Sequence, residues 1–174
     1  MLIVVAVVVG LMFAVTISLR AAGLLIPYRI PAAGMQPAIQ HDDQIAMEGV
    51  TYLFRTPRRG EMIVFSTNGI PSLAPNEVFV KRVAGVPGDR LRIADGRLLV
   101  NGQPAIFPPS GAKPVRYVNA GNFLRTPSEE FLVPPQSYFV LGDNSINSLD
   151  SRYWGVVPKA NLRGKVWFRY WPWR

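Results

Sequence analysis

Residues 78–102, VFVKRVAGVPGDRLRIADGRLLVNG, carry the features that decide the fold class of this chain. The stretch opens with Val78 to Val83, a run rich in β-branched and aromatic residues, which is typical of a buried strand. The turn formers Gly85, Pro87 and Gly88 follow at once. We therefore predict a strand that ends in a tight turn.

The second half of this stretch predicts a β-hairpin. Leu91 to Ile93 and Leu98 to Val100 are short apolar runs on either side of Ala94-Asp95-Gly96-Arg97. Asp-Gly is a favoured pair for a two-residue hairpin turn, because both positions need a positive φ. Asn101-Gly102 indicates a second turn directly after the hairpin.

The same signals recur on both sides of the stretch. Met62 to Phe65, Tyr138 to Leu141 and Val166 to Tyr170 are further β-rich runs, and the last is expected to close the domain. Residues 107–135 are rich in proline, glycine and polar side chains, so we expect a long surface excursion there. Residues 28–174 are therefore predicted to form a mainly β domain, a partly open β-barrel.

The N-terminal segment predicts a membrane anchor over residues 1–27. Leu2 to Leu19 is apolar apart from two hydroxyl residues, and after Arg20 the apolar run resumes as far as Pro27. About twenty apolar residues cross a bilayer core, with Arg20 able to reach the interface. A cleaved signal peptide is the alternative, although no Lys or Arg precedes the run. Nearby charges do not decide the side on which the domain lies, because long domains cross largely regardless of them.

Composition excludes several classes of site. The net charge of +8 invites contact with nucleic acid or anionic lipid, but Arg55, Arg58 and Arg59 form the only tight basic group. We therefore predict no nucleic-acid partner. The chain has no cysteine, which excludes disulfides, thiol nucleophiles and cysteine zinc sites. His41 is the only histidine, so a histidine-rich metal site is excluded and no cofactor is expected.

Lys81 is the first candidate for catalytic chemistry. It lies in the predicted strand on the same face as Phe79 and Val83, because side chains alternate along a strand. Burial among apolar neighbours lowers the pKa of an ammonium group, and a lysine lowered far enough acts as a general base near neutral pH. The alternative is an ordinary strand lysine whose head group reaches solvent.

A second candidate lies in residues 141–152, LGDNSINSLDSR. Its many turn formers are compatible with an ordinary surface loop. An ion pair between Asp150 and Arg152, with Ser148 and Ser151 around it, would instead order the loop and direct hydrogen bonds toward a neighbouring lysine.

Together with residues 30–39, IPAAGMQPAI, and residues 80–89, VKRVAGVPGD, this loop resembles the type I signal peptidase family in order and spacing. In that family a serine attacks the scissile carbonyl and a neutral lysine accepts its proton. The resemblance implies that Lys81 is the general base, that Ser148 orients it, and that Asp150 and Arg152 form a supporting ion pair.

The resemblance also implies a binding site and a location. Met35 and Pro37 match the residues after the nucleophile, and with Ala32 and Arg82 they are the expected substrate-binding residues. The implied ligands are signal peptides of exported precursors, cleaved after small residues. The implied location is the cytoplasmic membrane, in contact with lipid, with the β domain on the outer face.

The chain departs from the family pattern at the nucleophile. Gly34 occupies that position, and alanines stand at 32 and 38 where the family carries hydroxyl residues. No serine or threonine occurs from residue 19 to residue 50. Removing a serine nucleophile typically lowers the rate on the order of a millionfold.

Three functions remain open from the sequence. The chain is a signal peptidase family protein that binds signal-peptide-like segments as an added strand, with cleavage undecided. Alternatively it is an inactive homologue that holds precursors or a partner peptidase without cutting. The third hypothesis is a membrane-surface adaptor that uses its +8 charge on anionic lipid. A water activated by Lys81 is a further route to cleavage.

Overall fold

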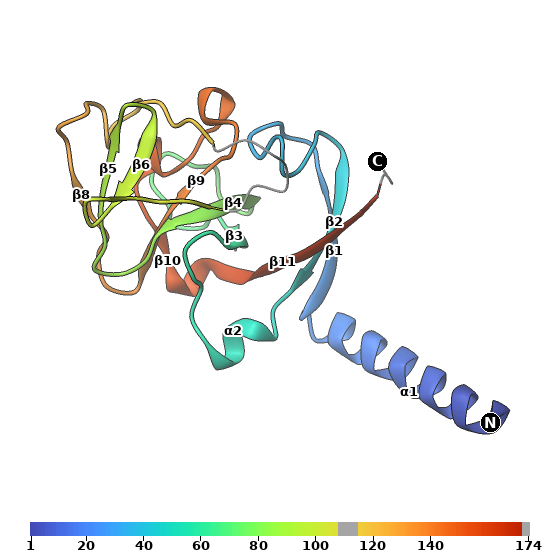
Figure 1. Cartoon of the computed structure of the whole chain (residues 1–174). Coiled ribbons are helices and arrows are strands. Elements are labelled where there is room, and N and C mark those ends of the chain that lie inside the picture. Colours follow the sequence, from blue (N-terminus) through green and yellow to red (C-terminus); the bar gives the residue numbers. More distant parts are fainter. Residues whose placement is uncertain (108–114, 172–174) are drawn as a thin grey trace.

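The structure is a computed structural model that describes residues 1–107 and 115–171. The apolar N-terminal residues form a single helix, α1 (Leu2–Ala21), which projects away from the β domain and buries none of its side chains (Figure 1). This helix is long and apolar enough to cross a membrane. A helix satisfies its backbone hydrogen bonds internally, which is what a bilayer core requires.

The helix ends before the predicted boundary of the anchor. Gly23 has a φ of 70° and its N–H donates to the Arg20 carbonyl, while the Leu24 N–H donates to the Leu19 carbonyl. This is a Schellman C-cap, and glycine takes the left-handed position at no steric cost. The chain then turns directly into β1 (Leu25–Ile30).

A seven-stranded antiparallel sheet forms the centre of the domain, in the order β1-β2-β11-β3-β4-β9-β10. The C-terminal strand β11 pairs with both β2 and β3, so the last strand of the chain completes the middle of the sheet. The edge strands β1 and β10 do not pair with each other within the described residues. The remaining strands of this sheet are β2 (Asp43–Glu48), β3 (Met62–Ser66), β4 (Val78–Gly85), β9 (Ser137–Leu141), β10 (Val157–Pro158) and β11 (Leu162–Trp171).

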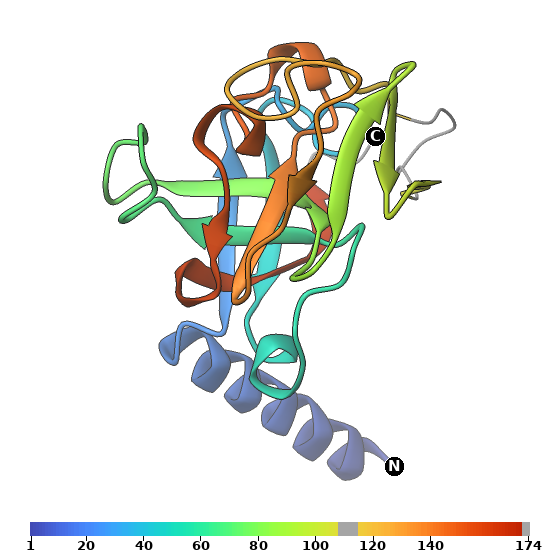
Figure 2. The same ribbon diagram turned by 90° about the vertical axis from the view of Figure 1, so that its left-hand side faces the viewer.

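A second, four-stranded sheet has the order β7-β6-β5-β8, and Figure 2 shows its β5–β6 hairpin standing beside β9. Its strands are β5 (Arg90–Ala94), β6 (Arg97–Val100), β7 (Gln103–Pro104) and β8 (Phe131–Leu132). Asp95 and Gly96 have φ values of 52° and 74°, which confirms the predicted hairpin turn. Asn101 and Gly102 likewise turn the chain from β6 into β7.

The mainly β class is confirmed. Every strand predicted from an apolar run lies within β3, β4, β5, β6, β9 or β11. Helical structure beyond α1 is limited to four short segments in the described residues: α2 (Thr51–Phe54), η1 (Ser145–Asn147), α3 (Ser151–Trp154) and η2 (Lys159–Asn161).

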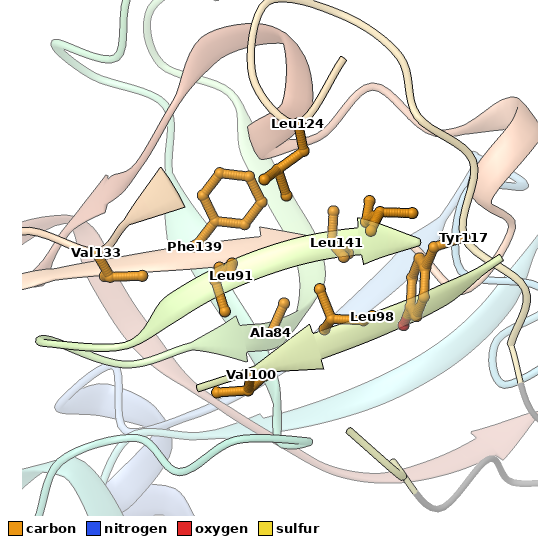
Figure 3. Close-up of a cluster of buried hydrophobic side chains, with 10 residues drawn as sticks. Ala84, Leu91, Leu98, Val100, Tyr117, Leu124, Val133, Phe139 and Leu141 are labelled. Carbon is orange, nitrogen blue, oxygen red and sulfur yellow. The ribbon is translucent and has the colours of Figure 1, made fainter. Parts of the chain in front are cut away.

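The main core lies between the β5–β6 hairpin and the seven-stranded sheet (Figure 3). The expected surface excursion, 107–135, contributes to it, in contrast to the prediction. Tyr117, Leu124 and Val133 are buried there against the hairpin, because its apolar face would otherwise meet water. Residues 108–114 of the excursion lie outside the described residues.

Candidate functional site

Lys81 lies in β4 with its side chain buried at 7% exposure. Its Nζ is 5.5 Å from the centre of the Phe79 ring, as the strand alternation predicted. Burial lowers the pKa of Lys81 below its ordinary value, and the nearby carboxylates of Asp150 and Asp143 oppose that shift. The head group is thus held in a setting that favours the neutral amine, the form that accepts a proton.

The buried pair Asp150–Arg152 orders the loop next to Lys81. Arg152 Nε and Nη2 donate to the two carboxylate oxygens of Asp150, each at 2.8 Å, and both side chains are fully buried. The remaining guanidinium protons are donated to Ser145 Oγ and O and to the Val118 carbonyl. Because every charge in this cluster has a partner, the loop is fixed in one conformation.

Ser148 is held close to Lys81 by the same loop. The Gly142 N–H donates to Asp150 Oδ2 at 3.0 Å, and a Cβ at position 142 would overlap the Ser148 side chain. Only glycine permits this close approach. Ser148 Oγ is buried and has no hydrogen-bond partner among the described residues.

Gly34 stands at the meeting point of these groups. Its carbonyl accepts a hydrogen bond from the Asn144 N–H at 3.1 Å, which ties the segment after β1 to the loop. A Cβ built at Gly34 would lie 3.4 Å from Lys81 Nζ and 3.4 Å from Ser148 Oγ, in ordinary van der Waals contact. Position 34 therefore has room for a side chain that would point its first polar atom at the buried lysine.

A groove of about 620 Å³ opens onto this position. One wall consists of residues 28–35, from β1 and the segment after it, and the other consists of residues 77–81 at the start of β4. Asn147 and Leu149 of the loop complete the lining. An extended peptide segment fits between two such strand-like walls.

The predicted site residues divide into those that line the groove and those that do not. Ala32, Gly34, Met35 and Lys81 line it. Ser148, Asp150 and Arg152 are buried beside it and support it.

The other two predicted substrate-binding residues lie outside the lining. Arg82 is buried in an ion pair with Asp143, whose oxygens accept from Nε at 2.7 Å and from Nη2 at 2.5 Å, and it also donates to the Gly60 carbonyl. Pro37 lines a separate small pocket against Val166 and Trp167. Arg82 thus stabilises the loop through Asp143 instead of facing the groove.

Three contributors to the site lie in the predicted loop, residues 141–152, but the sequence analysis gave them no individual role. The Asn147 carbonyl faces the Gly34 position, Asn144 holds the Gly34 segment through its N–H and its Nδ2, and Ser145 accepts from Arg152. Backbone carbonyls and loop amides are common to all turns, so only their placement in space identifies them.

The arrangement brings a buried lysine, a buried hydroxyl and a groove together at position 34, where glycine carries no side chain. Ser148 Oγ is a buried hydroxyl that borders the space at position 34, although Ser148 is not part of the groove lining. The Gly34 N–H remains as a backbone donor for an oxyanion.

Comparison with known proteins gives a consistent result. The family described as signal peptidase, peptidase S26, matches residues 1–171. Signal peptidase I of Leptolyngbya laminosa is 37% identical over 150 residues, which are 82% of this chain and 67% of that protein. Probable signal peptidase I-2 of Synechocystis is 35% identical over 147 residues, which are 82% of this chain and 62% of that protein.

A solved structure of a signal peptidase I from Enterococcus faecalis is also similar. It has 28% sequence identity and a TM-score of 0.48, and the match covers 64% of this chain and 97% of that one.

Proposed function

The chain belongs to the signal peptidase family, peptidase S26, and from this premise we propose that it binds signal-peptide segments of exported precursors without cleaving them. The observation that carries the proposal is the Gly34 position. The base, the orienting hydroxyl and the groove surround it, but the chain supplies no hydroxyl there.

The groove offers a strand edge to such a segment. β4 pairs with β9 only from Arg82 to Gly85, so residues 78–81 have no strand partner on that side among the described residues. A peptide added at this edge would form main-chain hydrogen bonds with β4, and the groove would receive alternate side chains. The small side chain of Ala32 in the opposite wall leaves room for this added strand.

Cleavage by this chain would need a nucleophile other than a side chain at position 34. Without the covalent route, family members retain only binding and electrostatic effects, so the rate is expected to fall on the order of a millionfold. The cluster of Lys81, Ser148 and the Asp150–Arg152 ion pair then serves binding. It shapes the floor of the groove and keeps the loop beside Gly34 ordered.

The helix α1 supports a location in the membrane. We infer a single span in the cytoplasmic membrane with the β domain on the outer face, where exported precursors emerge. The side chains of α1 are exposed to their surroundings over its whole length, and a bilayer would bury this apolar surface.

Peptide binding to the full chain in detergent tests the proposal. A fluorescent peptide that carries an apolar run and a small-residue cleavage site is expected to bind in a saturable way, as measured by anisotropy. Ala32→Trp fills the groove and should abolish binding, whereas Ala160→Trp, on exposed η2 away from the groove, should not. Equal binding by both variants would exclude the groove as the site.

A further inference from the structure

Resting on the proposed function, we propose that the groove selects peptides that end in a free α-carboxylate, with that carboxylate seated at Gly34 between Lys81 and Ser148. The ligand class is then the released product of a cleavage performed elsewhere, in preference to the uncut precursor.

The charges around Lys81 favour an anion at this position. Asp150 is paired with Arg152 and Asp143 with Arg82, so each nearby carboxylate already has a cationic partner of its own. Lys81 forms no salt bridge with any residue in the described parts of the chain, 1–107 and 115–171. Burial disfavours the charged form of Lys81, and a bound carboxylate opposes that effect because it supplies the counter-ion that the ammonium form lacks.

Ser148 provides an independent observation. Its Oγ is buried and has no partner in the described structure, and it lies 3.4 Å from a Cβ at Gly34. A buried hydroxyl without a hydrogen bond is unfavourable, because it has lost its bonds to water. A carboxylate oxygen at Gly34 would accept from this hydroxyl and from the Lys81 ammonium together.

The shape of the site also matches a carboxylate. The acyl ester that a serine would form here has two oxygens on one carbon, and a carboxylate has the same two oxygens on one carbon. A serine at position 34 would place its own oxygen where the second carboxylate oxygen must lie, whereas Gly34 leaves that place open.

An uncut peptide bond fits less well. It presents an amide N–H in place of the second oxygen, and this N–H would face the donor groups of a Lys81 ammonium and Ser148. Loss of the charge-assisted hydrogen bonds is expected to weaken binding about 10- to 100-fold.

The test compares two peptides of one sequence, ending in the same small residue, as the free acid and as the carboxamide. Anisotropy titrations use the full chain in detergent at physiological salt, where nonspecific attraction to the +8 charge is screened. We expect the acid to bind about 10- to 100-fold more tightly than the amide. This comparison uses the unaltered chain, so its outcome does not depend on whether a variant folds.

Two lysine variants test whether the preference for the free acid over the carboxamide comes from Lys81. Lys81→Met should bring the acid-to-amide ratio close to one, and Lys159→Met, at an exposed position on η2, should leave the ratio unchanged. A ratio retained in Lys81→Met would overturn the inference, because the preference would then come from net charge.

The same titrations separate this inference from the proposed function. Equal binding of acid and amide to the unaltered chain would overturn the carboxylate preference and leave groove binding supported. Failure of both peptides, and of a longer uncut segment, to bind would overturn the proposed function itself.

Discussion

The substitution Gly34→Ser would place a hydroxyl at the position that the proposed function leaves without a nucleophile. The added Cβ would lie 3.4 Å from its nearest neighbours, Asn147 O, Lys81 Nζ and Ser148 Oγ, which is ordinary contact. The backbone at Gly34 is outside the left-handed region, so a side chain introduces no strain there. The free energy of unfolding of the variant is expected to lie within about 1 kcal/mol of that of the unaltered chain, because Gly34 is buried but its added Cβ overlaps nothing.

The expected gain in activity follows from two opposing effects. A serine nucleophile with its base contributes on the order of a millionfold in rate. One oxyanion donor contributes on the order of 100- to 1,000-fold, and the hydroxyl that the family places at position 32 is absent in Ala32. Gly34→Ser should therefore cleave roughly 1,000- to 10,000-fold above the background of the unaltered chain, and a second change, Ala32→Ser, should raise the rate about 100-fold further.

The assay is cleavage of a precursor with a small-residue signal site, in detergent, followed by mass spectrometry. Gly34→Ala is the matched control, because it adds the Cβ without the hydroxyl and should remain inert. The double variant Gly34→Ser/Lys81→Met should also be inert, since the serine then has no base. A folded Gly34→Ser/Ala32→Ser protein that binds the precursor but does not cut it would refute the view that Lys81 is positioned as a base.

Three further outcomes are expected. The rate of cleavage by Gly34→Ser should rise with pH, with a midpoint below the ordinary lysine pKa of 10.5. The reason is that burial lowers the pKa of Lys81 and that only its neutral form accepts the proton. A midpoint at or above 10.5 would contradict the burial argument. Arg152→Met should lower the free energy of unfolding in urea by about 3–5 kcal/mol, because it leaves the buried Asp150 carboxylate without a partner. A change below about 1 kcal/mol would contradict the view that this buried ion pair stabilises the loop. Gly142→Ala should destabilise the chain by roughly 1–3 kcal/mol and weaken peptide binding in the groove, because the added Cβ overlaps Ser148 and the Gly34 carbonyl. Thermal unfolding measures the first effect and the peptide titration the second. An unchanged melting temperature would show that the loop adapts to the added Cβ.

The turns and central strands were predictable because their signals are local. Asp95-Gly96 and Asn101-Gly102 determine their backbone angles within two residues, and the strand around Lys81 is set by its own apolar neighbours. The helix α1 is shorter than the predicted anchor of residues 1–27. Hydropathy continues past Arg20, whereas the turn at Gly23 ends the helix there.

The excursion at 107–135 shows the limit of composition as a guide. Its prolines and glycines describe a chain without regular structure, but they do not show where its large side chains lie. Tyr117, Leu124 and Val133 become buried because the β5–β6 hairpin presents an uncovered apolar face, and this face exists only after the hairpin has formed.

The candidate site likewise has a part that the sequence predicts and a part that only the structure shows. The motifs brought Gly34, Lys81 and Ser148 into one hypothesis, and the structure places Lys81 Nζ and Ser148 Oγ each 3.4 Å from a Cβ built at Gly34. Arg82 was interpreted as substrate-binding from its place in the motif alone. Its partner Asp143 lies 61 residues further along the chain, so only the folded structure shows that its guanidinium is occupied.

The fate of a bound precursor tests the central claim most directly. The unaltered chain is saturated with a labelled precursor peptide in detergent and incubated for many times the lifetime of the complex. The peptide is then recovered, and its mass is measured by mass spectrometry. Recovery of intact peptide from a saturable complex that Ala32→Trp abolishes is the predicted result. Accumulation of a fragment cut at the signal site, which disappears in Lys81→Ala, would contradict the account, because the chain would then cleave with a nucleophile other than a side chain at position 34.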